Sequence, residues 1–206
     1  MTDVLPALTA RRARRAFDPR PLPEDALESL YQAVSLAPSH GNNQPVRLLV
    51  ARDPDIRAEV FAALSEGNRE WAGAAPALVA VAAIPDHDTV AKNRDGGDRP
   101  LWPFHAGIAT GNLLAQATSL GLIAHPMAGF DEAAVRAAFG APAEVRVLAV
   151  VALGFPGPVE ALVPDLQKRE LAPQRRLPLS HLVADGVWRP ENGLSWREYR
   201  ESQPPR

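Results

Sequence analysis

Residues 77–84 read Ala-Leu-Val-Ala-Val-Ala-Ala-Ile, an unbroken run of apolar side chains. A run of this kind, with no polar alternation, is typical of a strand that is buried on both faces of a sheet. A second, mostly apolar run covers residues 145–153 and is closed by Gly154. The two runs predict two buried strands, and the rest of the chain is interpreted outward from them.

Weaker periodic signals flank these strands. Residues 46–51 predict a further strand, and between Pro23 and Pro38 apolar residues recur at the spacing of an amphipathic helix. Further helices are expected after Thr2 or Asp3, after Asp53, over residues 104–120, and between Asp131 and Gly140. The pattern predicts an α+β or α/β chain with about four strands and five or six helices.

Two stretches lack periodicity. Residues 85–103 contain prolines, two glycines and scattered charges, so we expect a long loop, and loops of that length often act as lids. Residues 161–206 are rich in proline and arginine and show no strong amphipathic stripe. We therefore expect one domain over residues 1–160, and an extension over 161–206 that packs on this domain and on a second subunit.

Composition excludes several classes of function. The 206 residues include 22 Lys and Arg against 24 Asp and Glu, a net charge of −2 that argues against nucleic-acid binding. The absence of cysteine excludes disulfides, thiolate metal sites and a catalytic thiol. The five histidines form no His-x-His or His-x-x-x-His pair, so no metal site is expected. Without an apolar run of about 20 residues or a signal-peptide core, we expect a cytoplasmic protein that does not enter a membrane.

Three segments carry groups suited to ligand binding. Residues 11–20 hold five arginines, which form either a solvated basic helix end or a cradle for a phosphate. Residues 37–45 read Ala-Pro-Ser-His-Gly-Asn-Asn-Gln-Pro and form either a plain turn or a row of polar groups for the edge of a heteroaromatic ring. Residues 125–131 precede a helix, where free backbone N–H groups point outward. His125 could act as a base, although no partner stands at triad or metal spacing.

Taken in this order, the segments resemble the nitroreductase family of FMN-dependent oxidoreductases. The family's Arg-Arg-Ser-x-Arg-x-Phe stretch corresponds to residues 11–17, and its Ala-Pro-Ser-x-x-Asn-x-Gln-Pro-Trp motif corresponds to residues 37–46. Its Gly-Asn-x-x-Trp motif corresponds to residues 67–71, and Met-Ala-Gly-Phe-Asp stands at 127–131. Arg175-Arg176-Leu177-Pro178-Leu179 is similar to the family's last phosphate-contacting segment. The similarity extends over residues 8–180.

The resemblance implies an α+β fold with a central, mainly antiparallel sheet flanked by helices, and a homodimer whose C-terminal extension is swapped onto the partner subunit. It also implies an FMN site at the subunit interface. The implied phosphate contacts are Arg11, Arg12, Arg15 and Arg176, together with Ala13, which replaces the family's serine. Pro38, Ser39 and Asn42 would come from the partner, and Gln44 and Asn68 would face the flavin ring. Pro126, Met127, Ala128 and Gly129 would line the ring, the last two offering backbone N–H groups near N5.

The implied activity is a ping-pong reaction. NADH or NADPH would reduce the flavin, and a nitroaromatic, a quinone or another small-molecule oxidant would then accept two electrons. The flavin would carry the hydride, so no catalytic side chain is assigned. Two alternatives stay open: a flavin enzyme of the same fold with another reaction, such as dehalogenation or flavin destruction, and a flavin-free binding protein. The departures at Ala13, Val46 and Gln174 do not remove the site.

Overall fold

The computed structural model describes residues 3–203, which form two compact units. The first unit ends at Glu170 and the second starts at Leu171. Residues 161–170 belong to the first unit, where Leu162, Leu166 and Glu170 are buried. Thr2, one of the two caps proposed for the first helix, lies outside the described residues.

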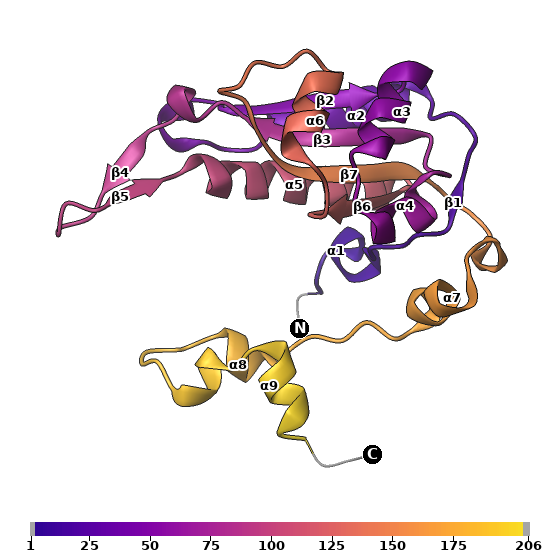
Figure 1. Cartoon of the computed structure of the whole chain (residues 1–206). Coiled ribbons are helices and arrows are strands. Elements are labelled where there is room, and N and C mark those ends of the chain that lie inside the picture. Colours follow the sequence, from indigo (N-terminus) through magenta and orange to yellow (C-terminus); the bar gives the residue numbers. More distant parts are fainter. Residues whose placement is uncertain (1–2, 204–206) are drawn as a thin grey trace. The chain divides into compact units, whose positions relative to one another are not determined.

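Figure 1 shows the elements in chain order. The strands are β1 (Phe17–Asp18), β2 (Val46–Ala51), β3 (Ala77–Ala83), β4 (Val90–Lys92), β5 (Asp98–Pro100), β6 (Ile123–Met127) and β7 (Arg146–Pro156). The α-helices are α1 (Pro6–Ala10), α2 (Glu24–Ser35), α3 (Pro54–Ala62), α4 (Glu66–Ala72), α5 (Trp102–Ser119), α6 (Glu132–Ala138), α7 (Pro164–Leu171), α8 (Leu179–Leu182) and α9 (Trp196–Glu201). Short 3₁₀ turns are η1 (His40–Asn42), η2 (Pro85–His87), η3 (Val159–Ala161) and η4 (Pro190–Gly193).

The two apolar runs found in the sequence are neighbouring strands at the centre of the main sheet. β7 pairs with β1, β3 and β6, and β3 also pairs with β2. All of these pairings are antiparallel. The expected α+β fold with a mainly antiparallel sheet is therefore confirmed, and the α/β alternative is wrong.

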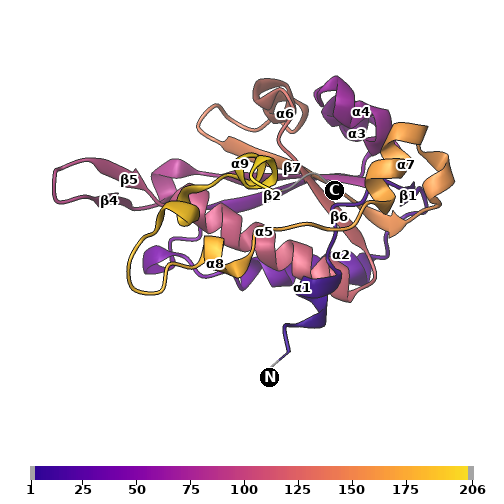
Figure 2. The same ribbon diagram turned by 90° about the horizontal axis from the view of Figure 1, so that it is seen from below.

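Helices cover both faces of this sheet, which explains why residues 77–83 show no polar alternation. Leu78, Ala80 and Ala82 face a core formed with α3, α4 and α6. The alternate residues of β3, among them Val79 and Val81, face a second core formed with α2 and α5. Figure 2 shows α5 running along this second face beside α2.

The stretch 85–103 is not the irregular loop that the sequence predicts. It contains η2 and a hairpin in which β4 pairs with β5, closed around Gly96 at φ +83°. An ion pair between Lys92 and Asp98 joins the two strands. The hairpin residues are largely exposed, so the alternation that marks a half-buried strand is absent from the sequence.

Two further differences concern the segments that carry the candidate site. The first helix begins after Leu5, without Asp3 as its cap, and ends at Ala10, so residues 11–16 lie outside it. Arg11 is the C-cap of this helix and the other arginines lie beyond it, so only Arg11 stands at the helix end that one interpretation assumed. Helix α4, which carries Asn68 and Trp71, was not predicted because it is only 7 residues long. In contrast, Asp53 and Asp131 cap α3 and α6 as expected.

The second unit contains α8, η4 and α9. Asn192 donates a hydrogen bond to the carbonyl of Ser180, and Ser195 and Glu198 form a capping box at the start of α9. Leu179, Val187 and Trp188 are exposed. Across residues 3–203, the helices are too short or too polar to cross a membrane.

Candidate functional site

The arginine segment is anchored through a single peptide group. The carbonyl of Arg14 accepts a hydrogen bond from Nδ1 of His125 at 2.9 Å. The N–H of Arg15, which belongs to the same peptide group, donates to Oε2 of Glu170 at 3.0 Å. His125 lies in β6 and Glu170 in α7, so two buried side chains from distant parts of the chain fix the orientation of the segment.

His125 is a structural donor here and not the base considered from the sequence. Its pKa is lowered to about 4, chiefly by burial and also by the nearby cations Arg15 and Arg11, against the opposing effect of the Arg14 carbonyl. The imidazole is therefore neutral at pH 7, with its proton on Nδ1. Its ring packs against Trp71, with 4.4 Å between centroids and an angle of 31° between the ring planes.

Glu170 places a negative charge beside the arginines. Its side chain is 1% exposed, and Nη1 of Arg15 lies 4.0 Å from Oε2. Oε1 of Glu170 is buried and has no hydrogen-bond partner within residues 3–203. The Arg15 guanidinium also lies 5.9 Å from the centroid of the Trp71 ring. Trp71 thus joins the arginine segment to α4.

Helix α4 in turn holds the residues that follow β6. Nδ2 of Asn68 and the N–H of Ser65 both donate to the carbonyl of Gly129, at 3.0 and 2.9 Å. A Cβ added at Gly129 would lie 2.5 Å from Oγ of Ser65 and 3.2 Å from Nδ2 of Asn68. A larger residue at 129 would therefore force the side chain of Ser65 to move.

These contacts bring together most of the residues that the resemblance assigned. We call this group the arginine cluster. It comprises Arg11, Arg15, Asn68 and Gly129, which make or adjoin these contacts, and their neighbours in the chain Arg12, Ala13, Pro126, Met127 and Ala128.

Residues 38–44 form a second, separate group, which we call the turn cluster. Oγ of Ser39 accepts from the N–H of Gln44 at 2.8 Å, and Nε2 of Gln44 donates to the carbonyl of Asn42 at 3.1 Å. Asn42 and Gln44 have positive φ angles of 58° and 48°. Asparagine tolerates this region, but for a residue such as glutamine it costs on the order of 1 kcal/mol or more.

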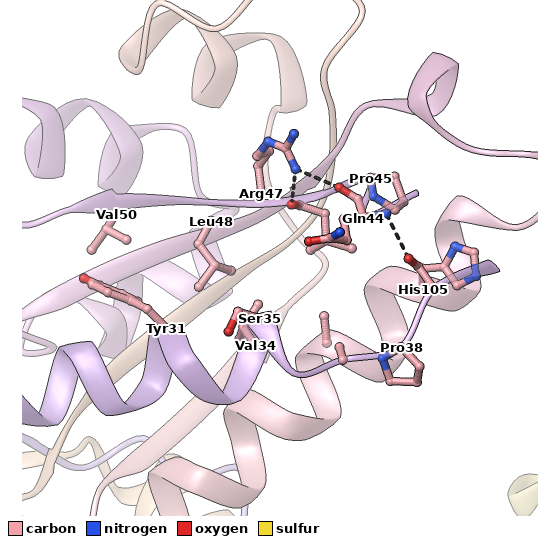
Figure 3. A pocket seen from close by; sticks show the side chains of 14 residues that line it. Tyr31, Val34, Ser35, Pro38, Gln44, Pro45, Arg47, Leu48, Val50 and His105 are labelled. Carbon is pink, nitrogen blue, oxygen red and sulfur yellow. Dashed lines mark hydrogen bonds between the residues drawn. The ribbon is translucent and has the colours of Figure 1, made fainter. Parts of the chain in front are cut away.

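The turn cluster borders a cavity of about 540 Å³ between α2 and β2. Pro38, Ser39 and Gln44 are among its lining residues. Figure 3 shows Leu48 and Val50 of β2 facing Tyr31 and Val34 of α2 across this cavity. The walls are largely apolar, with polar groups both at the turn and on α2, where Tyr31 and Ser35 line the cavity.

The two clusters lie at opposite edges of the sheet. The turn cluster precedes β2, whereas the arginine cluster includes the end of β6 and the two residues after it, and β3 and β7 separate these two strands. At about 4.8 Å per strand spacing, the edges are roughly 14 Å apart. Arg176 belongs to the second unit, in the stretch before α8.

The sequence interpretation did not assign roles to Glu170, Asp88 or His105. Glu170 stands among polar neighbours in an amphipathic helix, where nothing in the sequence distinguishes it from a surface carboxylate. Asp88 and His105 pair across 17 positions, in a spacing that belongs to no known motif. No group of three or more potential metal ligands occurs within residues 3–203.

Known proteins resemble this chain along most of its length. The model of the nitroreductase family matches residues 8–70 and 57–155. A Stenotrophomonas maltophilia protein, provisionally named NADH dehydrogenase/NAD(P)H nitroreductase, is 31% identical over 76% of this chain and 86% of its own length. The NADH dehydrogenase of Thermus thermophilus is 33% identical over 90% of this chain and 97% of its own length. A solved structure described as an oxidoreductase containing FMN has a TM-score of 0.79, with 31% identity over 91% of this chain and 94% of its own. The chain belongs to the nitroreductase family.

Proposed function

We propose that this protein is an FMN-dependent oxidoreductase that moves two electrons from NADH or NADPH to a nitroaromatic, a quinone or a related acceptor in a ping-pong reaction. Family membership and relatives named as NAD(P)H nitroreductase and as an FMN-containing oxidoreductase support the general class. The observation that carries the proposal is the Arg14–Arg15 peptide group, which the buried side chains of His125 and Glu170 hold in place.

The residues of the arginine cluster fit FMN in their chemistry. Several guanidinium groups in one short segment suit a phosphate dianion, because each offers a planar pair of donors. Arg11, Arg12 and Arg15 would hold the phosphate, and Arg176 of the second unit would add to them. Glu170 offsets part of the charge at Arg15, which keeps the repulsion among the arginines low before the anion binds.

The backbone after β6 would orient the ring. Asn68 and Ser65 donate to the carbonyl of Gly129, and so fix the peptide group that follows Gly129 at the end of this segment. The N–H groups of Ala128 and Gly129, which come just before it, would donate to the ring near N5. When bound, FMN supplies the hydride chemistry, and the protein supplies position and a binding surface that reductant and acceptor would use in turn.

The turn cluster would complete the site from a second copy of the chain. The strands β2 and β6 that carry the turn and the end of the arginine cluster are roughly 14 Å apart, which exceeds what one ring edge can bridge within a subunit. Pro38, Ser39 and Asn42 would therefore reach the ring from the partner subunit. Gln44 shares a hydrogen bond with Ser39, so it would come with them. In this homodimer, residues 171–206 would pack on the partner.

Purification tests the proposal directly. The protein should absorb in the flavin bands, release FMN on denaturation, and oxidise NADH or NADPH when a quinone or nitroaromatic is added. Initial rates measured against both substrates should give parallel double-reciprocal lines, as a ping-pong reaction requires. Colourless protein that takes up no added FMN would contradict the proposal.

A second measurement tests the phosphate assignment. Removing one charge-assisted hydrogen bond costs about 1.5–3 kcal/mol, so Arg11→Ala should weaken FMN binding roughly ten- to a hundredfold. Arg14→Ala is the matched control, since Arg14 contributes its carbonyl to the anchor and is not assigned to the phosphate. Equal losses in both variants would show that the arginines act as a diffuse positive field.

A further inference from the structure

A buried histidine and aspartate stand behind the turn cluster. Nδ1 of His105, in α5, lies 2.7 Å from Oδ2 of Asp88, and the two side chains are 4% and 1% exposed. On its other side, the His105 ring lies within hydrogen-bond distance of the turn, where the N–H of His40 points at Nε2 at 3.1 Å. The ring thus bridges the segment after η2 and the turn that borders the cavity.

The His40 bond fixes which nitrogen of His105 carries the proton. A backbone N–H can only donate, so Nε2 must offer its lone pair. The proton of the neutral ring is then on Nδ1, where it donates to Asp88. The second oxygen of Asp88 accepts from the N–H of Thr89 at 2.8 Å, so this carboxylate is anchored at both oxygens.

A second hydrogen bond joins the Asp88–Thr89 segment to the turn cluster. Nδ2 of Asn43 donates to Oγ1 of Thr89 at 2.9 Å. The turn is thus held at His40 and at Asn43, on either side of Asn42 with its positive φ angle. A backbone held away from its preferred region persists only where surrounding contacts determine it. The Asp88–Thr89 segment and His105 provide such contacts.

We propose that His105 is a positioning residue that holds the turn cluster in its ligand-binding conformation through the lone pair of Nε2. Asp88 orients the ring, and Thr89 adds the second tie. This role rests on the proposed function in so far as the turn binds FMN. The ordering of the turn itself does not require the flavin.

Two substitutions separate positioning from packing. Asparagine at 105 places an amide nitrogen near the position of Nδ1, so His105→Asn keeps the donor to Asp88 and loses the acceptor for His40. Glutamine is one methylene longer, so His105→Gln can offer an oxygen near the position of Nε2, while Asp88 loses its donor. His87→Gln is the control, because the His87 side chain is exposed one residue before Asp88.

Hydrogen–deuterium exchange of residues 39–45 in flavin-free protein is the deciding measurement, read together with thermal unfolding. For His105→Asn we expect exchange in this segment to rise about tenfold, with little change in Tm. For His105→Gln we expect a lower Tm, because Asp88 is left buried without its donor, but near-wild-type exchange at the turn. A purely structural role would make Tm and exchange change together in both variants, and that result would overturn the proposal.

Thr89→Val keeps the proposal testable if either histidine variant fails to fold. It removes the hydroxyl acceptor and preserves the shape of the side chain, so exchange should rise at Asn43; unchanged exchange would contradict the second tie. FMN titration of the same proteins should show about tenfold weaker binding for His105→Asn than for His105→Gln. Wild-type protein that binds no FMN would overturn the proposed function, while the exchange data would still decide whether His105 orders the turn.

Discussion

The neutral imidazole of His125 makes the stability of the protein depend on pH. Its folded pKa of about 4 lies below the unfolded value of 6.5, so the unfolded chain binds more protons between these pH values. The contribution of His125 to stability is therefore complete above about pH 6.5 and is lost progressively as the pH falls towards 4. The total loss attributable to this group is about 3 kcal/mol.

We expect His125→Asn to remove this dependence, because asparagine does not titrate and can still donate to the Arg14 carbonyl. Urea unfolding of both proteins at pH 7, 5.5 and 4 measures the effect. The wild type should lose about 3 kcal/mol more than the variant between pH 7 and pH 4. Equal losses would show that the folded pKa of His125 lies near its unfolded value of 6.5.

Gly129 tests the close approach between α4 and the segment after β6. In Gly129→Ala the new Cβ would press on Ser65 and Asn68, so we expect about tenfold weaker FMN binding, measured by fluorescence titration. Adding Ser65→Ala removes the nearer obstacle, the Ser65 hydroxyl, and should restore part of the affinity. Gly67→Ala is the control, because a Cβ at Gly67 meets nothing within 4 Å. Loss in the control alone would refute this interpretation.

At the scale of elements, the β4–β5 hairpin can be separated from the segment that precedes it. Val90 and Pro100 are a cross-strand pair, so a two-residue Gly-Gly turn can replace residues 91–99. We expect FMN affinity to stay within about twofold of wild type, because Asp88 and Thr89 keep their contacts with the turn cluster. The KM for the acceptor should change if the hairpin shapes its pocket.

Equilibrium titration and steady-state kinetics on the shortened protein distinguish these effects. A large loss of FMN affinity would show that the hairpin itself, and not Asp88 and Thr89, supports the turn. A chain that also lacks residues 88–90 is the comparison in which affinity should fall.

The elements that the sequence predicted are those whose signals are local. Each of these signals depends on residues that are close together in the sequence: the apolar run of β3, the amphipathic stripe of α2, and the caps at Asp53 and Asp131. The hairpin at 90–100 and helix α4 escaped prediction for opposite physical reasons. One is exposed, so it shows no alternation, and the other is too short to show a period.

At the scale of the whole molecule, the candidate site depends on contacts that no local pattern contains. The Arg15–Glu170 bond joins residues 155 positions apart, and the Arg14–His125 bond joins residues 111 positions apart. The motifs that this chain shares with the family, in the same order, identified the arginines, Asn68 and Gly129 as candidate FMN-binding residues. They gave no indication of Glu170 or His105, because those side chains act on backbone groups far away in the chain.

The division into two units predicts the effect of removing the second one. A chain that ends at Glu170 keeps the anchor of the arginine segment and should fold, but it lacks Arg176 and the extension proposed to pack on the partner. We expect a monomer with at least tenfold weaker FMN binding. Sedimentation velocity with and without FMN measures both properties.

Arg176→Ala in the full chain is the matched control. It should bind FMN more weakly and still form dimers, and FMN at a hundred times its Kd should stabilise the dimer by about 2.7 kcal/mol per site. A truncated chain that binds FMN with wild-type affinity as a monomer would show that one subunit builds the whole site.

The position of β7 in the sequence has a consequence for synthesis on the ribosome. This strand is the centre of the sheet, yet its last residue, Pro156, follows the end of β3 at Ala83 by 73 residues. At a synthesis rate of about 5–20 residues per second, β7 is complete roughly 4–15 s after β3. During that interval a fully apolar strand has one edge without a partner, which is a template for aggregation. A chaperone that binds apolar nascent segments should therefore raise the yield of this protein most if it acts before residue 156 is translated.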